Sequence, residues 1–170
     1  MKDRFYDYSS FSDERLEAVL KSWDGLGGYH GLLIKRIAEI IPPNSSVLDV
    51  GSGLLHLFEV IKDKVSYYCG VDSDAHIVSW AKERYPNIEI INSSVYDLDL
   101  KRKFDYVTAV GLYSDKPKER RGIEKLLDHA SVEVILTYWK DEQGINLFDY
   151  DVHGYPHDID SRLAIVGIYP

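Results

Sequence analysis

Cysteine and long hydrophobic runs are scarce in this 170-residue sequence, which contains Cys69 as its single cysteine. One cysteine excludes an intramolecular disulfide framework and a cysteine-rich zinc module. The longest apolar runs are much shorter than the roughly 18–20 residues that a membrane span requires. The N-terminal segment MKDRFYDYSS is polar and aromatic, unlike a secretory signal, so we expect a cytoplasmic protein without a membrane partner.

Basic residues are outnumbered, because 20 Lys and Arg stand against 28 Asp and Glu and give a net charge of −8. This balance disfavours a protein that holds a nucleic-acid backbone across its whole surface. Two basic clusters, at residues 101–103 and 116–121, leave a local contact with RNA open. Nucleic acid is therefore an allowed partner, but not the favoured one.

Linkers rich in Gly, Pro or Ser, low-complexity segments and internal repeats are also missing. The length is typical of one domain, and an apolar fraction of 45% is ordinary for a globular chain. We therefore expect residues 1–170 to form a single domain. It consists of an N-terminal helical segment, residues 1–42, followed by an α/β core, residues 43–170.

Hydrophobic spacing predicts two N-terminal helices, over residues 13–23 and 29–41, the second ended by Pro42 and Pro43. Beyond them, short apolar strands alternate with helices. The expected strands are residues 46–50, 66–71, 88–91, 104–110 and 132–138, and the expected helices are residues 54–62, 74–85 and 117–129. Strands that are apolar on both faces indicate a parallel sheet covered by helices on both sides.

The last thirty residues break this alternation. Residues 145–152 and 162–169 are expected to be strands, and a turn-rich stretch lies between them. They predict a terminal hairpin that adds an antiparallel strand to the sheet. The expected fold is a small, doubly wound, mostly parallel α/β domain with an antiparallel C-terminal strand.

A glycine turn follows the first expected strand, where open parallel sheets bind their ligands. Gly51 and Gly53 lack a Cβ, so the backbone can turn tightly and approach a ligand. Asp72 ends the second strand 21 residues after Gly51, and an acid at this spacing accepts hydrogen bonds from ribose hydroxyls. The pattern therefore predicts a ligand that contains a nucleoside.

The neighbouring residues narrow the choice of nucleoside ligand. A dinucleotide fingerprint needs a third glycine where His56 stands, and no Gly-Lys-Ser/Thr sequence of a P-loop follows Gly53. Asp49, two residues before Gly51, would repel a pyrophosphate but suits a ligand with an ammonium group. S-adenosylmethionine carries such a group together with a sulfonium.

Three motifs resemble the class I S-adenosylmethionine-dependent methyltransferase family. Val47-Leu48-Asp49-Val50-Gly51-Ser52-Gly53 resembles the first motif of that family, Gly70-Val71-Asp72 the acidic end of its second strand, and Phe104-Asp105-Tyr106-Val107 the start of its fourth strand. The resemblance covers roughly residues 30–140 in the family's order and spacing. It implies a seven-stranded sheet with a reversed last strand.

The resemblance also implies a cofactor site. The residues that would contact the methionine part are Asp49, Gly51, Ser52 and Gly53; the ribose would be held by Asp72; the adenine would lie beside Ser73, Ser94 and Val95; and the cofactor amine would lie near Val110 and Gly111. Several features depart from the family. Leu55 replaces its third glycine, Ser94 replaces a common acid, and the helices after the third and fifth strands find little room.

Candidates for catalysis are few. His30, Tyr113 and Asp115 could take a proton from an acceptor, although His30 also fits an ordinary helix start and Asp115 a helix cap. The sequence after the fourth strand is not the Asn/Asp-Pro-Pro-Tyr motif of enzymes that methylate amino groups of bases. A cluster of acids and histidines over residues 149–160 lacks any defined metal spacing, so we expect no metal.

The sequence therefore predicts methyl transfer from S-adenosylmethionine to an unidentified acceptor, with a small molecule or a protein favoured over RNA. One alternative is a catalytically inactive relative that binds a partner subunit or the cofactor without turnover. A third hypothesis is a nicotinamide-dependent oxidoreductase. It is disfavoured because His56 stands in place of the third glycine and a second domain is lacking.

Overall fold

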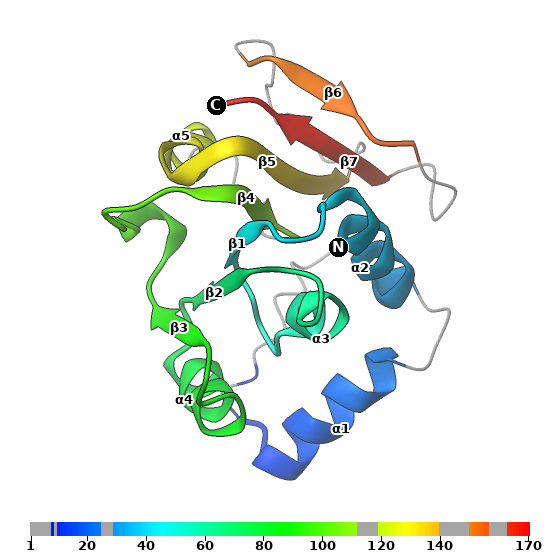
Figure 1. The fold of residues 1–170 in the computed structure, drawn as a ribbon. Coiled ribbons are helices and arrows are strands. Elements are labelled where there is room, and N and C mark those ends of the chain that lie inside the picture. Colours follow the sequence, from blue (N-terminus) through cyan, green and yellow to red (C-terminus); the bar gives the residue numbers. More distant parts are fainter. Residues whose placement is uncertain (1–7, 9, 25–28, 112–118, 140–149, 157–162) are drawn as a thin grey trace.

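A computed structural model describes residues 8, 10–24, 29–111, 119–139, 150–156 and 163–170 (Figure 1). Its centre is a seven-stranded sheet of order β3-β2-β1-β4-β5-β7-β6. The strands are β1 (Ser46–Val50), β2 (Tyr67–Asp72), β3 (Glu89–Asn92), β4 (Phe104–Ala109), β5 (Ala130–Trp139), β6 (Val152–Gly154) and β7 (Leu163–Ile168). Strands β1 to β5 are parallel, and β7 runs antiparallel to both β5 and β6, as the sequence predicts.

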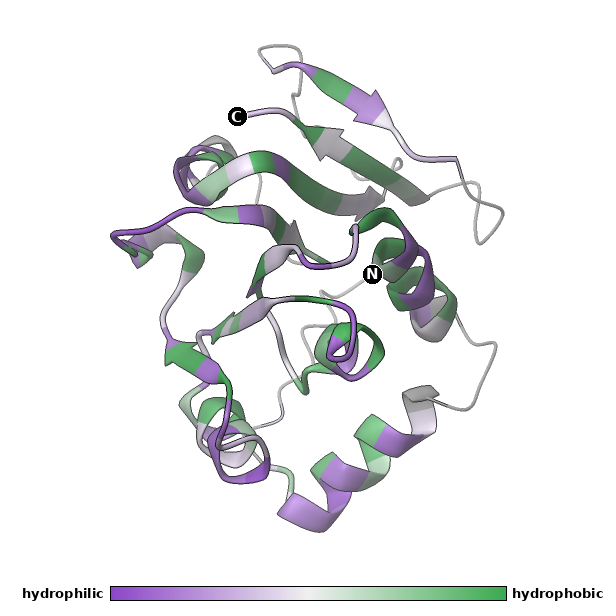
Figure 2. Cartoon of the chain, viewed as in Figure 1, coloured by the Kyte–Doolittle hydropathy of each residue, from purple (hydrophilic) through white to green (hydrophobic). Residues whose placement is uncertain are grey.

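Helices cover both faces of this sheet. They are α1 (Asp13–Asp24), α2 (Tyr29–Ile40), α3 (His56–Ile61), α4 (Ala75–Arg84) and α5 (Glu119–His129), with a 3-10 turn, η1 (Val95–Asp97), after β3. Successive residues of β1 point to opposite faces, so Val47 joins the core beneath α1 to α4, whereas Leu48 joins the core beneath η1 and α5. Figure 2 shows the mainly hydrophobic strands between helices with hydrophilic outer faces.

The interior of β2 holds the sole cysteine. Cys69 is fully buried in the second core cluster, and burial raises the pKa of its thiol to about 12. The thiol therefore stays protonated at neutral pH.

The strand order reverses direction at β1. One neighbour of β1 is β2, the next strand along the chain, and the other neighbour is β4. The chain runs from β1 to β2 and β3 on one side and then crosses to β4 on the other, and such a switch point is where open α/β sheets form their ligand crevice, at the carboxyl ends of β1 and β4. The glycine turn follows β1 at this place.

The structure corrects three expected boundaries. Helix α3 begins at His56 rather than at residue 54, because Leu55 adopts a left-handed conformation with φ 64° just before it. Strand β5 is longer than expected and starts at Ala130. The strand expected over residues 145–152 is instead the short β6, which begins at Val152, and residues 145–149 lie outside the described part of the chain. None of the helices within the described ranges is long and apolar enough to cross a membrane.

Candidate active site

The turn after β1 is built from residues in left-handed conformations. Gly51 has φ 76° and Gly53 has φ 50°, a region that side chains with a Cβ rarely adopt. The backbone N–H groups of Gly51 and Ser52 both donate to the carbonyl of Val71, at 2.8 and 3.0 Å. These bonds tie the turn to the end of β2, so the two carboxyl ends move as one unit.

Leu55 occupies the position of the family's third glycine and adopts the conformation of a glycine. Its φ of 64° is left-handed, while its side chain is fully buried in the core beneath α1 to α4. A Cβ placed on Gly70 would lie 3.1 Å from Leu55 Cδ2, so the missing side chain at Gly70 makes room for this leucine. The leucine therefore points into the core and does not fill the crevice.

Asp72 joins the glycine turn to the following helix. One carboxylate oxygen accepts from the N–H of Gly53 and the other from the N–H of Asp74, both at 2.9 Å. A carboxylate offers about four acceptor positions, so each oxygen retains one. The half-buried side chain is therefore held in place with acceptors left for a pair of ligand hydroxyls.

Asp49 lies beneath the turn and is only 4% exposed. Its two carboxylate oxygens accept from the hydroxyls of Tyr68 on β2 and Thr108 on β4, each at 2.7 Å. Burial raises the pKa of Asp49 to about 6, although the hydroxyls of Thr108 and Tyr68 act in the opposite direction. Within the described ranges, no ion pair joins this carboxylate to a cationic side chain.

Sequence reasoning missed Asp97, which lies in the η1 turn after β3. The hydroxyl of Ser94 donates to Asp97 Oδ2 at 2.6 Å across the η1 turn, which places a carboxylate next to the serine. The spacing of three residues between Ser94 and Asp97 could have predicted this contact, since one turn of a 3-10 helix brings residues i and i+3 together. Val95 is buried beneath the turn, and Ser73 is exposed at the end of β2.

The end of β4 is fixed by a second threonine. Gly111 has φ 69°, and its N–H donates to Thr137 Oγ1 on β5 at 2.9 Å, while Val110 before it is half-buried. Tyr113 and Asp115 lie outside the described residues. The structure thus places the start of the segment after β4 at the crevice, together with the turn after β1.

Two histidines lie at the start of α2 and α3. Burial lowers the pKa of His30, and burial together with nearby His30 lowers the pKa of His56 to about 4. Both imidazoles are therefore neutral at physiological pH. The lowered pKa makes His30 a weak proton acceptor.

The sequence predicts no metal site among the acids and histidines of residues 149–160. Of these, Asp151 is exposed, whereas His153 Nε2 lies 2.9 Å from Glu133 Oε1 on β5. Asp149, His157, Asp158 and Asp160 lie outside the described ranges. Among the residues that the structure covers, no group of three or more potential ligands could hold a metal ion.

Comparisons with known proteins find a matching family model and solved structures of similar fold. A family model described as a methyltransferase domain matches residues 47–131, whereas no curated protein sequence matches the chain. A TehB-like methyltransferase from Corynebacterium glutamicum superposes with a TM-score of 0.68 at 12% identity, over 93% of this chain and 99% of its own.

Two further structures are similar in fold. A magnesium protoporphyrin IX methyltransferase from Synechocystis, solved with S-adenosylmethionine, gives a TM-score of 0.60 at 13% identity, over 93% of this chain and 79% of its own. An rRNA methylase from Streptococcus thermophilus gives 0.59 at 14% identity, over 81% and 93%. At these sequence identities the similarity shows a shared fold alone.

Proposed function

Because the chain belongs to the methyltransferase domain family, we propose that it transfers a methyl group from S-adenosylmethionine to an acceptor. The observation that carries this proposal is the glycine turn fastened to Asp72. The turn supplies the close backbone approach, and the carboxylate keeps two acceptor positions for the ribose hydroxyls. Neither a P-loop nor a complete dinucleotide fingerprint competes for the same turn.

The residues of the turn fit the proposed cofactor. Ser52 Oγ is buried and makes no hydrogen bond within the described structure, so a ligand atom could satisfy it. A Cβ on Gly53 would meet no atom within 4 Å, which leaves open space beside the backbone. The negative charge of Asp49 lies beneath the same turn, and it would attract the cofactor's ammonium and sulfonium groups.

We assign the remaining contacts by position. Gly51, Ser52 and Gly53 would hold the methionine part, and Ser73 and Val95 would lie beside the adenine. Ser94 would present an acceptor for the adenine amino group, and its partner Asp97 could assist it. Val110 would lie near the cofactor amine, at the end of β4.

Bound S-adenosylmethionine supplies an activated methyl group, so positioning and exclusion of water are the main tasks of this chain. An acceptor that must lose its proton early would also require a base. His30 is a neutral imidazole at the edge of the helical layer and could take such a proton, as could Tyr113 or Asp115. These three residues remain candidates for the acceptor side of the site.

The basic cluster at residues 101–103 gives no support for an RNA acceptor. Lys101 bonds Asp99 at 2.7 Å, Arg102 pairs with Glu89, and Lys103 Nζ donates to the carbonyl of Ala130 at 3.1 Å. These residues precede β4, whereas the proposed cofactor site follows the other end of that strand. The cluster is thus engaged within the chain and distant from the proposed chemistry.

Calorimetric titration tests the function. We expect S-adenosylmethionine and its demethylated product to bind with micromolar dissociation constants, and NAD not to bind. Asp72→Ala should abolish both interactions, because the ribose acceptors are lost, whereas Asp63→Ala at an exposed loop should leave them unchanged. A folded protein that binds neither sulfur ligand would overturn the proposal and favour the role of a partner subunit.

A further inference from the structure

A cavity of about 210 Å³ opens within the helical layer. Its lining residues come from helices α1, α2 and α3, together with Arg84 at the end of α4. Its lining combines apolar and cationic side chains. None of the residues assigned above to the cofactor lines it.

The apolar walls come from three helices. Leu20 of α1, Ile34 of α2 and Val60 of α3 face the cavity, and Gly31 contributes no side chain that would fill it. Val60 is 42% exposed, so this wall of the cavity is open to solvent. A cavity of about 150 Å³ with aliphatic and aromatic walls admits benzene, so this volume suits an aromatic ring with a short substituent.

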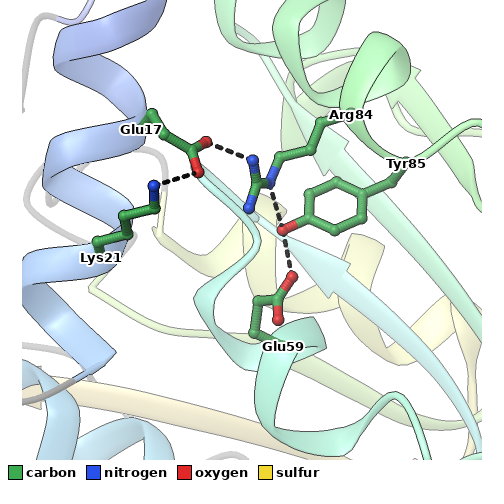
Figure 3. Close-up of polar contacts among 5 residues, drawn as sticks. All are labelled: Glu17, Lys21, Glu59, Arg84 and Tyr85. Atoms are coloured by element: carbon green, nitrogen blue, oxygen red, sulfur yellow. Dashed lines mark hydrogen bonds and ion pairs between the residues drawn. The ribbon is translucent and has the colours of Figure 1, made fainter.

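The charges around the cavity are predominantly positive. Lys21, Lys35 and Arg84 line it together with Glu59. Figure 3 shows how the carboxylates are already engaged: Glu17 pairs with both Lys21 and Arg84, and Glu59 accepts from Tyr85. Glu59 also pairs with Lys62 at 2.9 Å.

Lys35 is the cation of the cavity lining that these pairings do not include. Lys35 has no ion pair with any acid in the described part of the chain. The lining holds three cations, Lys21, Lys35 and Arg84, against one carboxylate, Glu59, in a chain whose net charge is −8. An excess of positive charge at one hollow of an acidic protein favours an anionic ligand.

His56 lines the inner wall of the cavity. Burial is the main cause that lowers the pKa of this imidazole to about 4, so it carries no charge at neutral pH. It therefore offers polarity without adding to the cationic rim. The charged partner of an anion in this cavity would therefore be Lys35.

We propose that this cavity binds a small aromatic carboxylate. The ring lies between Leu20, Ile34 and Val60, and the carboxylate pairs with Lys35 at the mouth. Such a ligand contacts α1, α2 and α3 together, so its binding free energy adds to the stability of the folded chain.

Phenylacetate is the probe, and phenylacetamide, which has the same shape without the charge, is its control. We expect phenylacetate to bind once per chain in calorimetry and to raise the midpoint of thermal unfolding. Phenylacetamide should bind at least about fivefold more weakly, because a charge contact of about 1 kcal/mol is lost. Lys35→Gln should weaken phenylacetate binding to a similar degree.

Lys82→Gln is the matched variant, since Lys82 is exposed on α4 and does not line the cavity. It should leave the affinity for phenylacetate within twofold of the original value. Three results would each overturn the proposal: no saturable binding by the folded protein, equal binding of phenylacetamide, or displacement of phenylacetate by the demethylated cofactor product. The last result would place the probe in the crevice beside the glycine turn.

Discussion

The side chain of Leu55 fills the space that a side chain on Gly70 would need. Leu55 Cδ2 lies 3.1 Å from the position of a Cβ on Gly70, and Ser52 Oγ lies 3.0 Å from it. The leucine keeps the left-handed backbone of a glycine and still adds a buried aliphatic group to the core. The glycine turn of this chain is therefore supported from below by apolar packing.

Leu55→Gly separates the two effects. The substitution relieves a left-handed conformation worth about 1–2 kcal/mol, but it removes a buried leucine worth roughly 2–5 kcal/mol. We expect the free energy of unfolding in urea to fall by about 2 kcal/mol. Asn44→Gly is the control, because Asn44 also has a left-handed φ, 63°, but is exposed. It should change the stability by less than about 0.5 kcal/mol, and a stabilised Leu55→Gly variant would contradict the packing role.

The buried carboxylate of Asp49 should make stability depend on pH. In the unfolded chain Asp49 loses its proton near its usual pKa of 3.8, and in the folded chain near 6. Between these values the folded state binds more protons, so the free energy of unfolding attributable to this residue falls as pH rises, by about 3 kcal/mol. Asp49→Asn removes this loss.

Urea unfolding of both proteins from pH 4 to pH 8 measures the effect. The Asp49→Asn variant should gain stability relative to the original chain as pH rises through this window. The same variant should bind S-adenosylmethionine more weakly at pH 8, because the negative charge beneath the turn is gone. A stability difference that does not vary with pH would show that the buried residue keeps an ordinary pKa.

Thr108 supplies one of the two hydrogen bonds to Asp49, and Thr108→Val removes the hydroxyl while keeping the shape of the side chain. A buried acceptor left without its donor costs about 1–3 kcal/mol. The pKa of Asp49 should rise further, because the Thr108 hydroxyl normally opposes the effect of burial. Thr108→Ser, which keeps the donor, should lose about 1 kcal/mol from the missing methyl group. Because only the valine removes the donor, an identical pH dependence of stability in the two variants would argue against the hydrogen bond.

Gly167 on β7 lies directly beneath the carboxylate of Glu133. A Cβ at Gly167 would lie 1.6 Å from Glu133 Oε1, and the two oxygens of this carboxylate share the hydroxyl proton donated by Tyr155, while Oε1 also contacts His153. Gly167→Ala must therefore displace a buried, hydrogen-bonded group, and we expect a loss of about 1–3 kcal/mol in urea unfolding.

Gly154→Ala on the neighbouring β6 is the matched control for that substitution. A Cβ there meets no atom within 4 Å, so its stability should change by less than about 0.5 kcal/mol. If the two alanine variants are equally stable, Glu133 moves aside without cost and does not fasten the hairpin.

Local patterns predicted much of this fold. The alternation of apolar strands with helices gave the parallel sheet, and the spacing from Gly51 to Asp72 correctly placed the carboxylate beside the glycine turn. Both signals lie within short stretches of sequence, where glycine conformation and strand length decide the structure. These two features can therefore be predicted without knowing the register of the other strands.

The partners of Asp49 could not be predicted in the same way. Tyr68 and Thr108 belong to the strands on either side of β1, and only the register of the sheet brings their hydroxyls to one carboxylate. The direction of Leu55 likewise depends on a single backbone angle, which no residue pattern reveals. The end of the strand expected at residue 152 was wrong, because β6 continues to Gly154 where it pairs with β7.

Cys69 gives this chain a built-in reporter of opening. Since its thiol is buried in β2 and remains protonated, an alkylating reagent can modify it only after the centre of the sheet separates. The rate of alkylation at increasing urea concentration therefore measures how often the core is exposed. A cysteine introduced at the surface can carry a fluorescent label while Cys69 stays in place.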